Sequence, residues 1–344
     1  MSHFKKPADI KVGCIGYGGI YNMGRQHLNE MAKAGMTPAA VCELDANRLK
    51  IAGEHFPGIQ MFSSVAEMLK KSDVNLLAVI TPHNTHAPLA IQCLKAGRHV
   101  VCEKPLAITT AECDAMFKEA AKRKLVISTY HNRHWDGHIL EAVKRIGNGQ
   151  LGDLVRVECR MGDYGKPSDT WRGSMSLSGG VCYDWGVHLL EYALQIIKSD
   201  IVEVSGYSHN GYWGPQTPWK KDCIEDEATA VVRFKNGCML TLRMSNIEAN
   251  GKPGIVEFTG TKGQYVMDFG GFDHFTHPVC GETAVIKGKN PASEGWKLYQ
   301  NIADHLTKGA PLVITGEWSR RPIHILDLAV KSAKLGKALP AKYK

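Results

Sequence analysis

The first 130 residues alternate short apolar runs with amphipathic stretches, and this alternation limits the fold more than any other feature. Five apolar runs have the length and composition of strands: residues 10–15, 39–42, 75–80, 98–102 and 125–129. Two of the helix-like stretches between them open with capping-box pairs, Ser64 with Glu67 and Thr109 with Glu112. Strands and helices alternating in this way predict a doubly wound parallel sheet with helices on both faces.

The pattern changes near residue 150, where strand-like runs begin to follow one another. They cover residues 153–161, 201–207, 228–234, 239–244, 255–259 and 264–268. Asn236-Gly237 between two of them predicts a hairpin with a type I′ turn, because both residues tolerate positive φ angles. Helices are expected at about 181–198, 294–307 and 317–335, on one face of a largely antiparallel sheet.

Together these patterns predict an α/β chain of two domains, a number that suits 344 residues. The N-terminal domain is expected over residues 1–130. The second, an α+β domain with a large, mostly antiparallel open sheet, is expected over residues 131–344. Its last helix is a candidate to pack back toward the first domain.

Composition favours a globular enzyme over a nucleic-acid-binding or membrane protein. Hydrophobic residues make up 44% of the chain and charged residues 22%. The net charge of +8 comes from scattered basic residues rather than from charge blocks, so it suits an anionic small ligand better than a nucleic acid. No apolar stretch approaches the roughly 20 residues that span a bilayer.

Cysteine usage and the N-terminus predict a cytoplasmic protein. None of the ten cysteines forms a C-x-x-C pair, and most lie in apolar runs, as expected of reduced, buried thiols. The first residues lead into the first predicted strand without the apolar region of a signal peptide.

The first candidate site is the glycine-rich turn after the first predicted strand. Gly16, Gly18 and Gly19 would allow a tight turn and a close approach of a pyrophosphate to the helix N-terminus. Ile20 and Tyr21 complete the turn, and Tyr21 occupies the third glycine position of G-x-G-x-x-G. A plain strand-to-helix turn is the alternative interpretation.

Glu43 follows the second predicted strand and favours NAD as the cofactor. A carboxylate there can accept hydrogen bonds from both ribose hydroxyls and would repel a 2′-phosphate. Arg48 lies on the next predicted helix and could instead reach such a phosphate, which keeps NADP open.

Two more segments end predicted strands at the same edge of the sheet. The loop from Thr81 to His86 follows the third of the five strand-like runs, and Asn84 or Thr85 is expected to cap the next helix. Lys104 follows the fourth run and would place an ammonium where open α/β sheets bind ligands.

Asp184 and His188 are the candidate catalytic pair of the second half. If residues 181–198 form one helix, the two side chains share a face at i and i+4, and Glu191 continues that face. An imidazole is the usual general base at neutral pH, and a neighbouring carboxylate can orient it. A solvated helix face is the structural alternative.

These motifs resemble the Gfo/Idh/MocA family, named after glucose-fructose oxidoreductase, inositol dehydrogenase and a rhizopine catabolism protein. The resemblance covers nearly the whole chain, and its most specific marks are Glu103-Lys104-Pro105 and the segment from Gly179 to His188. The chain departs from the family pattern at Tyr21, His83 and Glu191. The resemblance implies a Rossmann domain and a substrate-binding and oligomerisation domain.

The resemblance also implies the site. Its catalytic residues would be Lys104, Asp184 and His188, and its substrate contacts Lys104, Arg133, Trp171, Asp184 and His188. Its cofactor contacts would be Gly16, Gly18, Gly19, Ile20, Tyr21, Glu43, Thr81, Pro82, Asn84, His86, Glu103, Lys104, Asn132 and Arg172. No metal is expected, because His131, His134 and His138 lack a matching carboxylate pattern.

Three functions fit the family. The first is an NAD-dependent dehydrogenase oxidising a secondary hydroxyl of a sugar, cyclitol or glycoside. The second is a glycosidase that oxidises its substrate transiently, and the third is a non-catalytic NAD-sensing regulator. A homodimer or homotetramer is expected. The aromatic loop 207–219 suits either a sugar or a subunit contact, and residues 273–277 are expected to form a surface turn.

Overall fold

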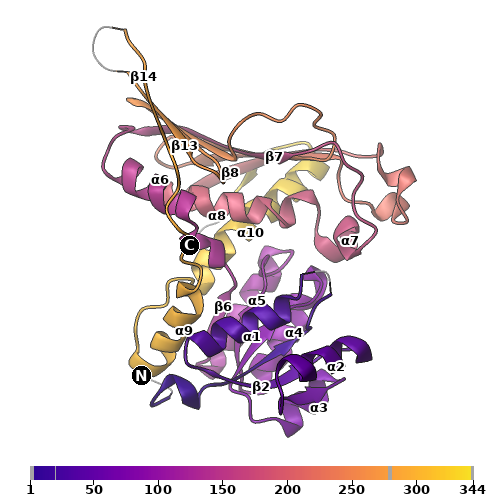
Figure 1. Cartoon of the computed structure of the whole chain (residues 1–344). Coiled ribbons are helices and arrows are strands. Elements are labelled where there is room, and N and C mark those ends of the chain that lie inside the picture. Colours follow the sequence, from indigo (N-terminus) through magenta and orange to yellow (C-terminus); the bar gives the residue numbers. More distant parts are fainter. Residues whose placement is uncertain (1–3, 20, 278–280, 342–344) are drawn as a thin grey trace. The chain divides into compact units, whose positions relative to one another are not determined.

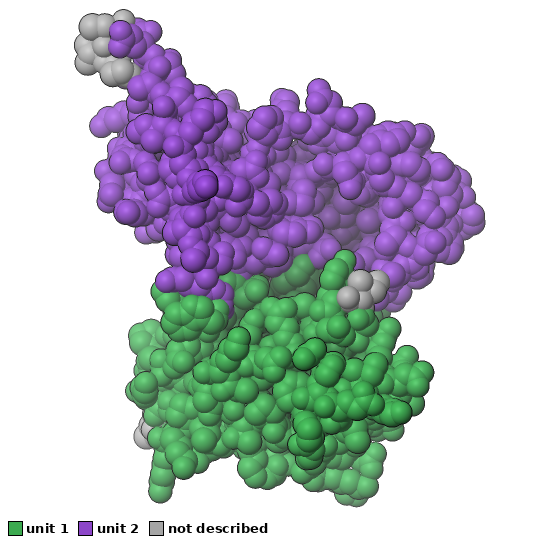
Figure 2. All heavy atoms as spheres, viewed as in Figure 1, with its two compact units in different colours: residues 1–132, 296–320 green, residues 133–295, 321–344 purple. Residues whose placement is uncertain are grey.

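The computed structural model describes residues 4–19, 21–277 and 281–341, and it divides into two compact units (Figures 1 and 2). Unit 1 comprises residues 1–132 and 296–320, and unit 2 comprises residues 133–295 and 321–344. Each unit has its own sheet and its own apolar core. Ile20, one of the expected cofactor contacts, lies outside the described residues.

Unit 1 is built on a six-stranded sheet in the order β3-β2-β1-β4-β5-β6, and all its strands are parallel. The order reverses between β1 and β4, which is the point where doubly wound sheets bind dinucleotides. The predicted Rossmann fold is therefore confirmed. Its strands are β1 Lys11–Ile15, β2 Thr37–Cys42, β3 Gln60–Phe62, β4 Leu76–Val79, β5 His99–Cys102 and β6 Ile127–Thr129.

Helices pack on this sheet because their apolar residues lie on one side. The capping box of Thr109 and Glu112 starts α5 as predicted, whereas Ser64 only accepts the Glu67 N–H at the start of α3. A distant segment completes the unit, since Phe4 N–H donates to Leu306 O at 3.2 Å. The helices are α1 Met23–Lys33, α2 Ala46–His55, α3 Val65–Lys71, α4 His86–Lys95, α5 Thr110–Arg123, α9 Lys297–Lys308 and the start of α10 Gly316–Leu335.

Unit 2 carries a nine-stranded sheet in the order β14-β13-β12-β11-β7-β10-β9-β8-β15. Only β7 and β10 run parallel, so the predicted mostly antiparallel sheet is confirmed. The strands are β7 Leu154–Gly162, β8 Ile201–His209, β9 Glu227–Phe234, β10 Met239–Ser245, β11 Val256–Gly260, β12 Gly263–Met267, β13 Phe272–Thr276, β14 Ala284–Gly288 and β15 Leu339–Pro340.

The helices of unit 2 are α6 Gly137–Gly147, α7 Met175–Ser178, α8 Gly186–Ile196 and the rest of α10. α8 packs on β7 and β10, and α6 packs on β12. Every residue of α8 from Gly186 to Leu194 is buried, because this helix lies against the centre of the sheet. The start of α8 is therefore held in a fixed place.

Three predictions about unit 2 are wrong. Residues 181–198 do not form one helix, because a 3₁₀ turn, Val181–Tyr183, ends before α8 begins at Gly186. Residues 273–277 are mostly strand β13 rather than a surface turn. The hairpin between β9 and β10 exists, but only Gly237 has a positive φ, so its turn is not type I′.

Candidate active site

The glycine turn of unit 1 follows β1 at the switch point of the sheet. Gly16 and Gly18 have φ angles of +85° and +83°, a conformation that side-chain-bearing residues rarely adopt. A Cβ on Gly16 would lie 2.0 Å from Ile80 O, so β1 and the end of β4 approach too closely for any other residue.

This turn fits a bound pyrophosphate. The Asn22 side chain makes no capping hydrogen bond to α1, although the Gly24 N–H in the first turn already donates to Tyr17 O at 3.0 Å. Tyr21 is 65% exposed and precedes the helix, so it does not disturb helix packing. The turn therefore offers peptide dipoles to an anion at the switch point.

Glu43 is tied to the glycine turn. Its Oε2 accepts the Tyr17 N–H at 2.7 Å, and its Oε1 accepts the Leu44 N–H at 2.7 Å. Glu43 Oε1 also accepts the Asp45 N–H at 3.1 Å, so about one of the four acceptor positions of the carboxylate remains for a ribose hydroxyl. Arg48 lies against the same turn, since a Cβ on Gly19 would be 2.4 Å from Arg48 Nη2. Glu43 and Arg48, the two residues that the sequence suggests for cofactor choice, therefore both lie beside the glycine turn.

The buried His86 ring contacts the loop that follows β4. Its two ring nitrogens lie 2.8 Å from Thr81 O and from Pro105 O, and the ring is fully buried. Burial lowers the pKa of His86. The neutral ring has one N–H, so His86 donates to one of these two carbonyl oxygens and lies between two loops of the ligand edge. The predicted cap is wrong, because the Thr85 hydroxyl donates to Thr81 Oγ1 and Pro82 O instead.

Lys104 follows β5, and its peptide bond to Pro105 is cis. Glu103 Oε2 accepts the Lys104 N–H at 2.8 Å, and Glu103 Oε1 lies 3.0 Å from His27 Nε2. His27 Nδ1 in turn lies 2.5 Å from the Tyr299 hydroxyl. Burial raises the pKa of Glu103, but the His27 contact and the Lys104 charge outweigh burial and lower it below the usual value. Glu103 thus fixes the backbone of Lys104.

Sequence reasoning missed His27 and Tyr299. His27 is fully buried on α1, and Tyr299 comes from α9 at the far end of the chain. The fold brings these two residues together beside Glu103, so no spacing in the sequence could have indicated that His27 and Tyr299 contact each other there.

In unit 2, Asp184 and His188 lie around the start of α8 rather than on one helix. Asp184 follows the 3₁₀ turn Val181–Tyr183, and its side chain is 40% exposed. His188 lies in the first turn of α8 and is 4% exposed. The expected single helix is therefore absent, since Asp184 lies in the turn Asp184-Trp185, which precedes α8 and has helical backbone angles.

Gly180, before this turn, lies against a carboxylate that sequence reasoning missed. Glu225 is 6% exposed, and its Oε2 accepts the Val181 N–H at 2.9 Å. A Cβ on Gly180, whose φ is +126°, would lie 2.7 Å from that oxygen. Burial raises the pKa of Glu225. Gly179, with φ +94°, ends α7, and Gly180 leaves room for Glu225 beside the turn that leads to Asp184.

Unit 2 also brings Arg172 to Asp184. Arg172 Nε lies 3.8 Å from Asp184 Oδ2, and its guanidinium lies over the Trp171 ring at 4.4 Å. Three of the predicted residues are therefore neighbours. Asn132 and Arg133 lie on the 3₁₀ turn Asn132–Trp135, where the chain passes from unit 1 to unit 2.

His131, His134 and His138 fall in a loop, a 3₁₀ turn and α6 respectively, so they do not form one helix face. Within residues 4–19, 21–277 and 281–341, no group of three metal-ligating side chains gathers. In the same ranges no helix is long and apolar enough to cross a lipid bilayer.

Residues 10–131 match the NAD-binding Rossmann-fold domain of the Gfo/Idh/MocA oxidoreductases, and residues 139–266 match the C-terminal domain of the same family. The chain belongs to the Gfo/Idh/MocA family. It is accordingly an oxidoreductase with a domain for a nicotinamide dinucleotide.

Individual relatives are distant. An uncharacterised oxidoreductase, C115.03 of Schizosaccharomyces pombe, is 34% identical over 41% of this chain, and the match spans only 39% of that protein. The scyllo-inositol 2-dehydrogenase (NADP⁺) IolW of Bacillus subtilis is 24% identical over 96% of this chain and 95% of its own. Myo-inositol 2-dehydrogenase of Thermotoga maritima is 26% identical over 75% of each chain.

Among solved structures, a levoglucosan dehydrogenase in complex with NADH superposes with a TM-score of 0.81. It is 19% identical and covers 96% of this chain, with 98% of its own chain matched. At that identity the likeness shows the fold alone.

Proposed function

We propose that this protein oxidises a secondary hydroxyl of a sugar, cyclitol or glycoside with NAD as the hydride acceptor. The observation that carries the proposal is that Lys104 is fixed at the ligand edge of a dinucleotide-binding sheet by Glu103 and His27. Unit 2 supplies a carboxylate and an imidazole at the start of α8. Inositol dehydrogenases among the relatives support a polyol substrate.

The proposed roles follow from charge and hydrogen bonding. Bound NAD would supply the hydride acceptor. His188 accepts the hydroxyl proton, and the Lys104 ammonium stabilises the alkoxide that develops on the substrate oxygen. Asp184 orients the hydroxyl or the imidazole, and Arg172 contacts the cofactor or the substrate.

The cofactor-binding role is assigned to residues at the carboxyl ends of β1, β2, β4 and β5, to Asn132 and to Arg172 of unit 2. Gly16, Gly18 and Gly19 would cradle the pyrophosphate, and Glu43 would accept a ribose hydroxyl. The remaining proposed contacts are Tyr21, Thr81, Pro82, Asn84, His86, Glu103, Lys104, Asn132 and Arg172. His86 and Glu103 would act through the loops that they contact.

A screen of monosaccharides, inositols and glycosides tests the reaction class. Accumulation of NADH with one substrate group supports the dehydrogenase. Release of an aglycone without net NADH would instead identify the redox-neutral glycosidase, and binding of NADH with no turnover of any compound would identify a sensor.

Glu43 gives a testable prediction for cofactor choice. Replacing Glu43 by glutamine removes the negative charge beside the ribose, so the preference for NAD over NADP is expected to fall about 10-fold. The ratio of kcat/KM for the two cofactors measures it. Arg48→Met is the matched variant, and it should raise the same ratio if the guanidinium assists a 2′-phosphate. An unchanged ratio in both variants would remove these residues from cofactor selection.

We also propose that the protein acts in the cytoplasm as a homodimer or homotetramer. The nine cysteines among the described residues are all free thiols, which suits a reducing compartment. Light scattering of the purified chain measures the assembly.

A further inference from the structure

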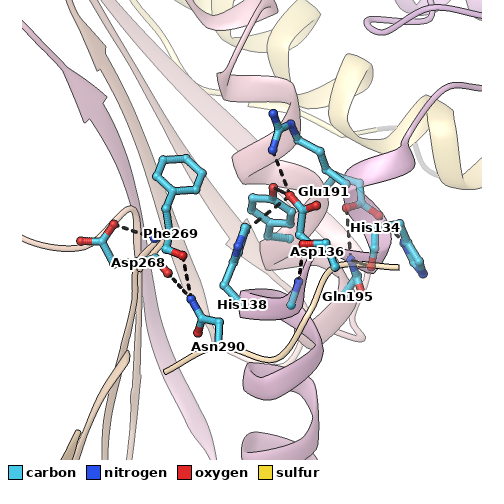
Figure 3. Close-up of polar contacts among 12 residues, drawn as sticks. His134, Asp136, His138, Glu191, Gln195, Asp268, Phe269 and Asn290 are labelled. Carbon is cyan, nitrogen blue, oxygen red and sulfur yellow. Dashed lines mark hydrogen bonds and ion pairs between the residues drawn. The ribbon is translucent and has the colours of Figure 1, made fainter. Parts of the chain in front are cut away.

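A connected set of side chains joins the start of unit 2 to the helix that carries His188 (Figure 3). It comprises residues of the turn Asn132–Trp135, the N-cap of α6 and three side chains of α8. The family resemblance implies a substrate contact for Arg133, but neither it nor the proposed mechanism gives Asp136 or Tyr192 a role.

Asp136 is the centre of the set. It is 9% exposed, and its Oδ2 accepts the Tyr192 hydroxyl at 2.8 Å and the Arg133 Nη1–H at 3.0 Å. Burial and the Asp136 charge raise the pKa of Tyr192, so its hydroxyl remains a donor. A buried carboxylate needs such partners, because losing one leaves an uncompensated charge. Asp136 therefore ties Arg133 to α8.

The guanidinium held in this way covers Trp185. Arg133 Cζ lies 4.6 Å from the Trp185 ring centroid, a cation–π distance. The Trp185 ring meets two others edge-on, His188 and Phe269, each with centroids 5.5 Å away. The His188 imidazole therefore packs against a ring whose own position depends on Arg133.

A second group of contacts, which does not involve Arg133, holds the turn Asn132–Trp135 against α8. His134 Nδ1 lies 2.5 Å from Glu191 Oε1, and Gln195 Nε2 donates to Glu191 Oε2 at 3.1 Å and to His134 O at 3.2 Å (Figure 3). Removing the Arg133 guanidinium should thus disturb Trp185 without releasing the turn from the helix.

We propose that Arg133 and Asp136 are positioning residues for His188. Tyr192 holds Asp136, Asp136 holds the Arg133 guanidinium over Trp185, and the covered Trp185 ring fixes the imidazole that the proposed function uses as its base. This inference rests on that function for its effect on turnover, but the contact itself is independent of it. Arg133 then acts through Trp185 rather than by binding substrate.

Arg133→Met tests the proposal, with Arg145→Met as its matched control. Arg145 is also paired to a carboxylate, Glu141 at 2.6 Å, and also covers a ring, Phe272 at 4.3 Å, but it lies on α6. R133M is expected to lower kcat about 10-fold with KM and NADH affinity unchanged, because a small displacement of a base slows proton transfer. R145M should leave kcat unchanged.

Two further variants distinguish a specific effect of Arg133 on His188 from a general loss of folding. R133K keeps a cation for Asp136 and for the Trp185 face but loses the planar guanidinium, so kcat should lie between those of R133M and the original enzyme. Y192F removes one hydrogen bond from Asp136 without changing Arg133, so kcat should fall by about 3-fold. Normal kcat in both R133M and Y192F would overturn the proposal.

A nuclear magnetic resonance readout separates this inference from the proposed function. The ¹⁵N signals of the His188 ring, assigned by their loss in H188N, should shift in R133M and stay in place in R145M. If H188N keeps normal turnover, the proposed base is wrong, whereas the ring signals still test the positioning. If H188N abolishes turnover while R133M changes neither kcat nor the ring signals, only the positioning is wrong.

Discussion

Replacing Lys104 by methionine is expected to lower kcat/KM for the substrate by about 10³-fold while NADH binding stays within about 2-fold. Methionine keeps the length of the side chain but removes the ammonium that would stabilise a developing alkoxide. The Lys104 backbone should stay in place, because Glu103 holds its N–H and His27 holds Glu103. Steady-state kinetics and NADH titration measure the two quantities.

Two other variants define what the lysine does. K118M removes an equal charge from the exposed face of α5 and should leave turnover unchanged. K104R keeps a cation that cannot lose its proton, so it separates charge stabilisation from proton transfer. If K104R recovers much of the rate, the ammonium acts by its charge. Near-normal turnover of K104M would exclude the proposed role altogether.

A double-mutant cycle tests whether Lys104 and His188 serve one step. Each single variant, K104M and H188N, should lose about 10²-fold to 10⁴-fold in kcat. If both groups act on the same hydroxyl, the double variant should lose far less than the product of the single losses. Fully multiplicative losses would mean that the two residues act in separate steps.

The sequence predicted unit 1 well because its signals are local. A parallel strand is buried on both faces and appears as an uninterrupted apolar run, as in Leu76–Val79 and His99–Cys102. The strand β3 escaped prediction because it has three residues and two of them are exposed. The glycine turn, Glu43 and Lys104 were found because each directly follows one of these apolar runs.

Around His188 the local signals were misleading. Residues 181–198 are apolar with helical spacing, yet Gly180 and the Glu225 contact to Val181 force a separate turn before α8. Glu225 lies 44 residues from Val181 in the chain. The start of α8 therefore depends on a tertiary contact between residues too far apart in the sequence for a local pattern to predict it.

Supporting residues were the least predictable part of the candidate site. His27 and Tyr299 are 272 residues apart, and Asp136 and Tyr192 are 56 apart. The type of each side chain does not indicate which distant group it will contact. Pairing appears only when the sheet order and the packing of α1, α8 and α9 are known.

Gly16→Ala should destabilise unit 1 by about 3 kcal/mol or more and lower NADH affinity by at least about 100-fold. Two costs combine at this position. The φ of +85° is unfavourable for a residue with a Cβ, and the new carbon would lie 2.0 Å from Ile80 O. That oxygen belongs to the backbone at the end of β4 and cannot rotate away. Thermal unfolding and NADH titration measure the effects.

Two other glycines distinguish the cost of the positive φ from the cost of the steric clash. Each has nearly the same φ as Gly16, but an added Cβ would not come close to a backbone oxygen. Gly58 has φ +86° and a Cβ added there would meet nothing within 4 Å, so G58A should cost about 1 kcal/mol and leave NADH affinity unchanged. Gly18 has φ +83° and a nearest neighbour at 3.3 Å, Met23 N. G18A should cost about 1–2 kcal/mol, yet it should weaken NADH binding because the methyl group lies where the pyrophosphate would approach. If the melting temperature of G16A is no lower than that of G58A, Gly16 does not lie as close to Ile80 O as the structure indicates. If G18A binds NADH normally, the pyrophosphate does not lie on this turn.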